Sequence, residues 1–428
     1  MAVKKWVLAG SAVLLLVVLG AGYYQFQKTE PLSADAQALI ATVQYPEYQA
    51  NLSNRNFFMA AGIEAATDKE AEELGRLRYH RSWQLLAQNE IQNSILDQDP
   101  QIQTIIAKSA VFSSDELNVL RAWSEAVNEG SAISFLQQQQ QQQQMQTLVT
   151  KFGVQIDRYA HIYNQDYRDL PMSVFGHGLP NEKQMMLMHH LFLAKVMLDK
   201  DKPAEKMQQY QQYLEHLRQA QVVSDIQLLT QLINLKLMDS TIQMMTELSL
   251  SSHLPNIKIE PLNAQEMSIE NGLIGNMLYI NRATGSAKEA QLRSQIPTEV
   301  SINKTTAAIL PVIELSKMPY PQMLSSLAKG VKSKPYSAPL KYLRMKPVLD
   351  IMGGSQDYLK YAIRPRIVDY RIHLFNAIQS GLSVSELNAQ DTYGQYTEEG
   401  QKLCLELPKE FKAQYESNAA LCLMRPVK

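Results

Sequence analysis

The feature that most constrains this chain is an uncharged apolar run from Trp6 to Tyr24, which directly follows Lys4 and Lys5. The nineteen residues of the run span roughly 28 Å as a helix, which matches the hydrocarbon thickness of a bilayer. No later stretch reaches that length without a charge. Residues 1–28 are therefore predicted to form a membrane anchor, with contact to the membrane through residues 6–24.

A cleaved signal peptide is the alternative reading of the same segment. Gly20-Ala21-Gly22 offers the small residues that a cleavage site needs, and cleavage would leave a soluble secreted protein. The aromatic residues at the two ends of the run, Trp6 and Tyr23-Tyr24, lie where a membrane-interface belt places them, which favours the uncleaved anchor. The preceding lysines should hold the N-terminus in the cytoplasm and leave the rest of the chain on the far side.

Composition favours a helical body. Glutamine, leucine, alanine and methionine are abundant and glycine is modest, which is typical of helices. A formal net charge of −1 argues against a nucleic-acid binder. We therefore predict an all-α fold.

Helix signals divide the body into three parts. Capping boxes are predicted at Thr67 with Glu70, Ser113 with Glu116, and Asn263 with Glu266. Three consecutive helices between residues 181 and 250, joined by short turns, indicate antiparallel helical hairpins in a bundle or an irregular α-solenoid. Seven prolines from Pro297 to Pro347 then shorten the helices, and the strand-like fragment at Cys404 to Leu407 ends at Pro408. The predicted units are an acidic N-terminal helical lobe over 31–145, central hairpins over 146–296, and a proline-rich C-terminal lobe over 297–428.

Several of these pieces resemble a family of uncharacterised, singly anchored proteobacterial envelope proteins. They are the anchor, Asn54 through Gly62-Ile63 and Ala65, the helix start from Leu262 to Gly272, and Pro347 through Tyr358, Tyr361 and Asp369. The relatives have Asn-Pro followed by Gly where this chain has Lys346-Pro347-Val348. The resemblance implies a bacterial inner-membrane protein with a helical body in the periplasm, and it implies no activity.

Two groups of residues have the composition of a metal site or a catalytic site. His189 and His190 adjoin Met185, Met186 and Met188, which are soft ligands that suit copper(I), but adjacent helical residues point about 100° apart. Core packing explains them more simply, and no metal or cofactor is predicted. An envelope enzyme of hydrolase type with dispersed residues remains the alternative to a binding protein, with His161, His177 and Asp166 as candidates. Ser355 follows two glycines and could be a nucleophile, but turns explain these glycines more simply.

Charge is distributed unevenly along the chain. Pro31 to Gln140 carries fourteen acidic and seven basic side chains, whereas Leu315 to Leu349 carries no acid. The basic stretch either pairs with the acidic lobe of the same chain or forms a surface for an anionic partner or anionic lipid head groups. The residues proposed for that surface are Lys329, Lys332, Lys334, Lys341, Arg344 and Lys346.

The two cysteines, Cys404 and Cys422, are predicted to form a disulfide because the inferred compartment is oxidising. Their leucine neighbours leave open the reading of two small buried residues. Taken together, the sequence predicts an inner-membrane-anchored periplasmic protein that acts by binding, as a scaffold or assembly factor for a protein partner.

Overall fold

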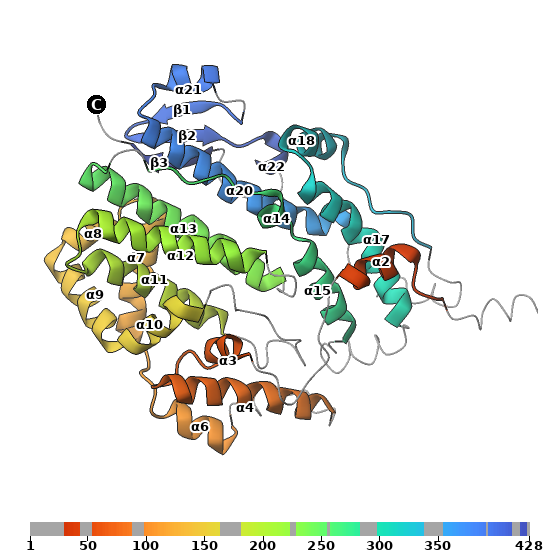
Figure 1. Cartoon of the computed structure of the whole chain (residues 1–428), viewed down its shortest axis with the longest axis horizontal. Helices are drawn as coiled ribbons and strands as arrows, with labels where there is room; N and C mark the ends of the chain where they lie inside the picture. Colours follow the sequence, from red (N-terminus) through yellow and green to blue (C-terminus); the bar gives the residue numbers. More distant parts are fainter. Residues whose placement is uncertain are drawn as a thin grey trace, which may run out of the picture.

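The computed structural model describes residues 30–42, 54–87, 98–162, 181–222, 228–254, 257–282, 298–337, 354–390, 393–412 and 420–425. The chain is mostly helical there, as the sequence predicts (Figure 1). Residues 6–24, the predicted anchor, lie outside these ranges. Within them, no helix has both the length and the apolar character that a membrane span requires.

In the described ranges, four helices precede residue 110. They are α2 (Ala34–Thr42), α3 (Arg55–Ala61), α4 (Asp68–Ala87) and α6 (Pro100–Ile106). Helices α3 and α4 pack at unusually short range, because Gly62 and Gly75 let backbone approach backbone: a Cβ at Gly75 would lie 1.9 Å from the carbonyl oxygen of Phe58. Asn54 is one of the residues on which the family resemblance rests. Its side chain caps α3 by accepting a hydrogen bond from the N–H of Phe57 at 3.1 Å.

Seven further helices lie in the described residues between 114 and 252. They are α7 (Ser114–Glu129), α8 (Ala132–Gln137), α9 (Gln139–Lys151), α10 (Gly153–Ile162), α11 (Glu182–Leu198), α12 (Pro203–Gln221) and α13 (Leu228–Ser252). The capping box of Ser113 and Glu116 is confirmed, and Gly130 ends α7 in the left-handed conformation. Most of the glutamine run forms the exposed first turns of α9.

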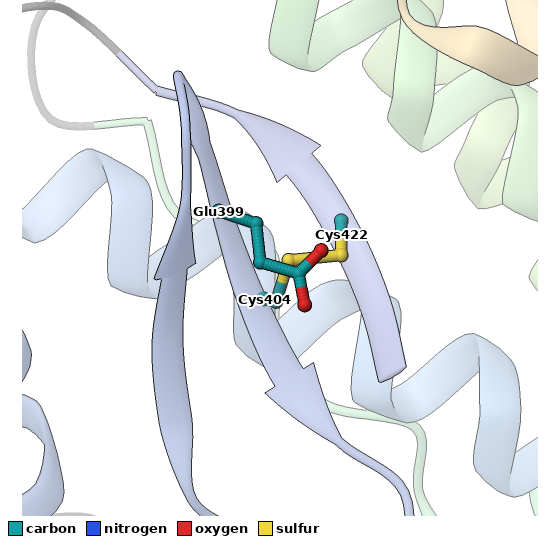
Figure 2. A group of neighbouring side chains, drawn as sticks. All are labelled: Glu399, Cys404 and Cys422. Carbon is teal, nitrogen blue, oxygen red and sulfur yellow. A yellow bond between two sulfur atoms is a disulfide. The ribbon is translucent and has the colours of Figure 1, made fainter. Parts of the chain in front are cut away.

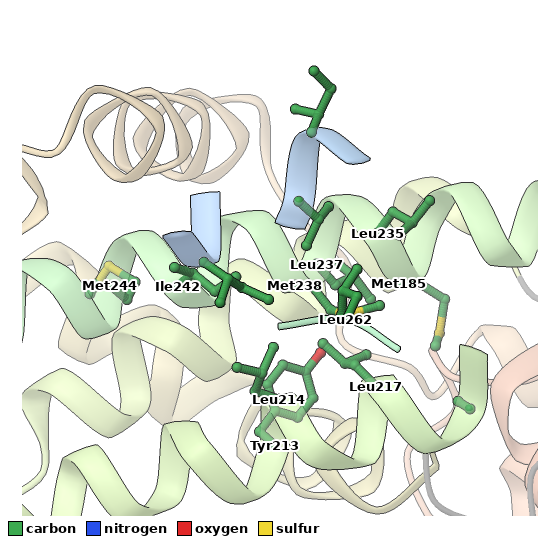
Figure 3. Close-up of a cluster of buried hydrophobic side chains, with 14 of the residues drawn as sticks. Met185, Tyr213, Leu214, Leu217, Leu235, Leu237, Met238, Ile242, Met244 and Leu262 are labelled. Atoms are coloured by element: carbon green, nitrogen blue, oxygen red, sulfur yellow. The ribbon is translucent and has the colours of Figure 1, made fainter. Parts of the chain in front are cut away.

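Helices α12 and α13 pack side by side and form the middle of the hydrophobic core (Figure 3). Tyr213, Leu214 and Leu217 of α12 face Leu237 and Met238 of α13. Helix α13 is buried along most of its length because α7, α11, α12 and α15 contact it from several sides. The core therefore extends through most of the body as one cluster, with a small second cluster between α4 and α6.

The remaining helices are α14 (Ala264–Met267), α15 (Glu270–Arg282), α17 (Thr298–Lys317), α18 (Tyr320–Lys329), α20 (Ser355–Ser380), α21 (Val384–Gln390) and α22 (Lys409–Lys412). The capping box of Asn263 and Glu266 is confirmed. Gly381 ends α20 in the left-handed conformation. Helix α20 lies across α17 on one side and α13 on the other, so it joins the C-terminal elements to the central core.

Residues 396–424 include a small antiparallel sheet, of which the sequence predicts only the strand-like fragment at Cys404 to Leu407. Its strands are β1 (Tyr396–Glu399), β2 (Lys402–Glu406) and β3 (Ala420–Met424), in the order β1-β2-β3. Pro408 does end β2, as its missing N–H requires, but β3 returns later in the chain to pair with it. The sheet packs on α20 and α13.

Candidate functional site

Three of the six proposed basic residues lie in the described part of the chain. Lys329 ends α18, and Lys332 and Lys334 follow in an extended segment, residues 331–337, which we call the strap. The Lys334 ammonium contacts the Asp35 carboxylate of α2 at 3.0 Å, so this lysine pairs with the acidic N-terminal region. Lys329 and Lys332 are exposed, and no ion pair joins either of them to another residue in the described ranges. Lys341, Arg344 and Lys346 lie outside those ranges.

The strap is held by a carbonyl group that a proline leaves free. Pro311 lies inside α17 and has no N–H to donate to the carbonyl oxygen of Ala307, one turn earlier. The backbone N–H of Lys334 donates to that oxygen at 2.8 Å instead. The strap is thereby fixed along the surface of α17 at the position of the proline.

A serine of the strap also caps the longest helix of the C-terminal lobe. Gly354, at the N-cap of α20, has no side chain, and the Ser333 hydroxyl accepts a hydrogen bond from the Ser355 N–H at 2.9 Å. The Ser355 hydroxyl donates to the Ala308 carbonyl at 2.6 Å and is buried. Ser355 therefore has a structural position, inside the contact between α17, the strap and α20.

The start of the described chain is attached to the same surface. The Asn303 amide of α17 is buried; it accepts from the Ser33 N–H at 2.8 Å and donates to the Pro31 carbonyl at 2.9 Å. The Tyr336 hydroxyl of the strap donates to the Glu30 carboxylate at 2.9 Å. Helix α2 therefore packs on α17, far along the sequence, and Figure 1 shows it beside the strap.

A cleft of about 360 Å³ opens where α18, the strap, α20 and α22 meet. We call it the strap cleft. Its lining combines apolar and polar side chains, chiefly Leu327, Val331, Leu359, Gln356, Lys409 and Glu410. The Gln356 side chain donates to the Val331 carbonyl at 2.7 Å, which holds the strap against the first turn of α20.

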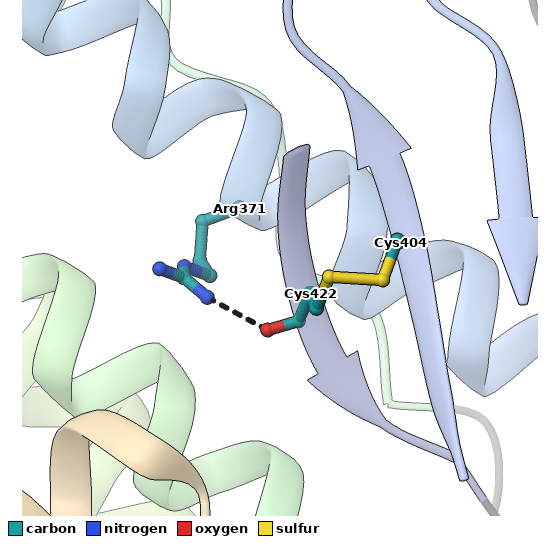
Figure 4. Close-up of a disulfide and its surroundings, with 3 residues drawn as sticks. All are labelled: Arg371, Cys404 and Cys422. Carbon is teal, nitrogen blue, oxygen red and sulfur yellow. Dashed lines mark hydrogen bonds between the residues drawn. A yellow bond between two sulfur atoms is a disulfide. The ribbon is translucent and has the colours of Figure 1, made fainter. Parts of the chain in front are cut away.

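Cys404 and Cys422 occupy directly opposed positions on β2 and β3, and a disulfide joins them (Figure 4). Arg371 of α20 donates to the Cys422 carbonyl at 3.2 Å and forms an ion pair with Asp239 of α13 at 2.8 Å. This arginine links the disulfide-bearing sheet to the two central helices.

The Glu399 carboxylate lies close to the same two sulfur atoms, and all three groups fall within 4.8 Å of one another (Figure 2). A carboxylate and two thiolates would suit a zinc ion. In the disulfide state the sulfur atoms are bonded to each other and are not thiolates, so this donor set does not fit a metal.

The histidine pair of α11 lies in the core. His189 is fully buried, and its ring nitrogens face the Ser240 hydroxyl at 2.6 Å and the Tyr213 hydroxyl at 3.2 Å. His190 contacts the Ser124 hydroxyl at 2.9 Å. Burial lowers the pKa of His189 well below its usual value and lowers that of His190 to about 4, so both rings are neutral. Both ring nitrogens of His189 are engaged in protein hydrogen bonds, which supports the core-packing reading over a copper site.

Of the hydrolase candidates, His161 lies in the described ranges, whereas Asp166 and His177 lie outside them. His161 lines a second cleft, of about 510 Å³, with Arg158 and Asp68. The Arg158 guanidinium is buried; it pairs with Asp68 at 2.9 Å and donates to the Ile63 carbonyl at 2.7 Å. These contacts tie α10 to the turn between α3 and α4, so the arginine and the carboxylate stabilise the fold.

Comparison with protein-family models, with curated proteins and with solved structures finds no match for this chain.

The exposed lysines are evident from the sequence, but the cleft beside them is not. Gln356, Leu359 and Lys409 lie outside the basic stretch, and only the docking of α20 and α22 brings them to the strap. One signal was available: Pro311 within an otherwise helical run predicts a free carbonyl at Ala307, and hence a hydrogen-bond donor from outside the helix.

Proposed function

We propose that the protein is a membrane-tethered binding protein that meets an anionic partner through Lys329 and Lys332. The observation that carries the proposal is the attachment of residues 30–33 to α17 and of Glu30 to the strap. The apolar run ends at Tyr24, with five residues between it and Glu30, so in this proposal the tether would meet the body near the strap that carries Lys332. In this arrangement the exposed lysines would face the surroundings of the point at which the tether leaves the body.

Pairing with acidic residues of the same chain accounts for only some of the described lysines in the basic stretch. Lys334 pairs with Asp35, and Lys317 pairs with Glu270. Lys329 and Lys332 remain exposed in the ranges that the structure describes, and their charges are available for association. The body acts in this proposal as a scaffold whose position is set by the tether and whose partner is selected by charge.

The tether is tested by fractionation of the full chain. The protein should remain in membranes after a carbonate wash, retain Trp6 and carry an active extracytoplasmic reporter fused after Lys428. Soluble protein that begins near Tyr23 would contradict the tether.

The binding surface is tested by charge reversal. Lys329→Glu combined with Lys332→Glu should lower the salt concentration at which the detergent-solubilised protein leaves an immobilised polyanion such as heparin, because exposed charges act through a screened field. Lys183→Glu with Lys200→Glu reverses two other exposed lysines and is the matched control. Equal shifts for both pairs would contradict a specific surface.

A further inference from the structure

We infer that Glu399, Cys404 and Cys422 bind a zinc ion when the disulfide between the two cysteines is reduced to two thiols. The inference goes beyond the proposed function and does not depend on the tether. It rests on the position of the three donors on one face of the sheet, on the backbone contacts that keep them there, and on the charges and the access around them.

The strand register places the three donor groups on one face of the small sheet. Cys404 opposes Cys422 with their Cα atoms 4.0 Å apart, and directly opposed residues of antiparallel strands point to the same side. Cys404 also opposes Thr397 of β1, and Glu399 lies two positions further along that strand, so its side chain returns to the same face. The ligand atoms of the three residues lie within 4.8 Å of one another, and Figure 2 shows the Glu399 carboxylate beside the two sulfur atoms.

Reduction turns this group into a donor set that suits zinc. Zinc in proteins takes thiolate ligands at about 2.3 Å and carboxylate oxygens at about 2.0–2.2 Å, usually in a tetrahedral arrangement. Two thiolates on one tetrahedral zinc ion therefore lie roughly 3.8 Å apart, which opposed cysteines reach by rotation of their side chains. With Glu399 as the third protein ligand, the fourth position is left for water, as in zinc sites that stay open.

Backbone contacts, and not the disulfide alone, hold the two cysteines opposite each other. Strands β2 and β3 pair over five positions, 402–406 with 420–424, and the sheet packs on α20 and α13. Arg371 of α20 also donates to the Cys422 carbonyl at 3.2 Å (Figure 4). The donors should therefore stay in place after reduction, so that little ordering of the chain opposes metal binding.

The Glu399 carboxylate is available for a cation. The neighbouring Glu398 pairs with Arg425 at 2.6 Å, whereas no hydrogen bond or ion pair joins the Glu399 carboxylate to another residue in the part of the chain that the structure describes. Two thiolates and a carboxylate carry one negative charge more than a zinc ion neutralises. Lys402 opposes Glu399 in the register and so lies on the same face, where its positive charge offsets part of that excess.

The site is accessible from one side. Glu399 is exposed and Cys422 is partly exposed, whereas Cys404 is fully buried. A metal ion would therefore meet Glu399 and Cys422 first, and the buried Cys404 thiolate would complete the site from the interior of the sheet.

The reductant is a dithiol. One of its thiolates attacks the accessible Cys422 sulfur and releases the Cys404 thiolate, which takes up a proton. The second thiolate of the reductant then displaces the Cys422 thiolate, which is protonated in turn, and the reductant leaves as its own disulfide. Zinc finally replaces one proton on each thiol, so the bridge and the metal site exclude each other.

The test uses the full, detergent-solubilised chain, reduced with a phosphine because free dithiols bind zinc themselves. Cobalt(II) is the probe, since its bonds to thiolates absorb strongly in the near ultraviolet. We expect one cobalt ion per reduced chain with this absorption, and its displacement by zinc. The oxidised chain should show no such absorption.

Variants separate this site from other metal-binding groups. Cys404→Ser with Cys422→Ser should abolish the thiolate absorption. Glu399→Gln should weaken zinc binding by roughly tenfold or more, because even groups that only support a ligand account for that factor. Glu398→Gln removes the neighbouring charge on the opposite face of β1 and should leave zinc affinity unchanged, so it is the matched control.

Absence of cobalt–thiolate absorption in the reduced chain would overturn the inference. Hydrogen exchange of residues 402–406 and 420–424 reports whether the reduced sheet stays folded, and loss of its protection would overturn the inference because the strands would no longer hold the donors. Equal zinc affinity of the Glu399 and Glu398 variants would remove the carboxylate from the site and overturn the three-ligand assignment. Zinc binding that survives in the double cysteine variant with unchanged affinity would place the metal elsewhere and overturn it too.

Discussion

Pro311 and Lys334 are joined through a single carbonyl group. Pro311 cannot donate a hydrogen bond to the Ala307 oxygen, and the backbone N–H of Lys334 occupies that oxygen at 2.8 Å. A residue that breaks the hydrogen-bond ladder of one helix thus creates the attachment point of the strap. The contact fixes the strap, which carries Lys332 and lines the strap cleft through Val331.

The first prediction concerns the serine that caps α20. Ser333→Ala should destabilise the protein by about 1 kcal/mol, because the Ser355 N–H loses its acceptor at the start of a long helix. Urea unfolding measures the change. Ser337→Ala, at an exposed position of the same strap, should change the free energy of unfolding by less than about 0.5 kcal/mol. Equal effects would contradict the cap.

The second prediction concerns the attachment of α2. Asn303→Ala removes the hydrogen bonds to Ser33 and Pro31. Because the Asn303 amide is buried and makes both bonds, its loss should lower the free energy of unfolding by about 1–3 kcal/mol. Proteolysis within residues 30–42 should accelerate before the rest of the body is cut. Glu299→Ala, an exposed residue of the same helix, is the control. Unchanged cleavage in the Asn303 variant would show that α2 is held by other contacts.

The third prediction concerns the contact of α3 with α4. Gly75→Ala should destabilise by at least about 3 kcal/mol, since the new methyl group would lie 1.9 Å from the Phe58 carbonyl oxygen and backbone must move. Gly153→Ala is the matched control, because nothing lies within 4 Å of its Cβ position and alanine is the better helix former. Thermal unfolding compares the two variants. A Gly75 variant as stable as the control would contradict the close packing.

The fourth prediction uses the buried Glu247, whose carboxylate accepts a hydrogen bond from the Ile133 N–H at 2.9 Å. Burial raises the pKa of Glu247 to about 7, whereas the unfolded chain releases this proton near pH 4.5. Between these values unfolding releases a proton, so this group lowers stability as the pH rises, and the loss is complete above pH 7.

Glu247→Gln removes that dependence. The variant should be more stable than the wild type at pH 8, by up to roughly 3 kcal/mol, and the difference should vanish near pH 4.5. Urea unfolding across this pH range provides the measurement. Glu129→Gln, which removes an exposed charge of the neighbouring helix α7, should show no such trend. A difference in the free energy of unfolding between the two variants that stays constant at all pH values would contradict the raised pKa of Glu247.

The fifth prediction concerns Cys404 and Cys422. Denatured, unreduced protein from its native compartment should contain no free thiol, and two thiols per chain would contradict the bridge. The chain-entropy model gives a stabilisation of roughly 3 kcal/mol for a sequence separation of 18. Cys404→Ala with Cys422→Ala should lose that amount, and reduced wild-type protein should match the double variant.

Local signals determined much of the secondary structure. Ser113 with Glu116 and Asn263 with Glu266 were predicted as capping boxes and form them, because each requires only residues three positions apart. Gly381 ends α20 for an equally local reason, since glycine adopts the left-handed conformation at little cost. Composition likewise predicted a mostly helical body.

Contacts between distant residues were decided only by the tertiary structure. The pairing of β2 with β3 depends on a strand that follows Pro408 and reverses direction, and no local pattern encodes that return. His189 could be a metal ligand or a core residue by sequence alone; burial against Ser240 and Tyr213 decided between the two. The lysines of the strap are visible in the sequence, but whether each is paired depends on α2 crossing to α17, since an ion pair needs two side chains within about 4 Å in space.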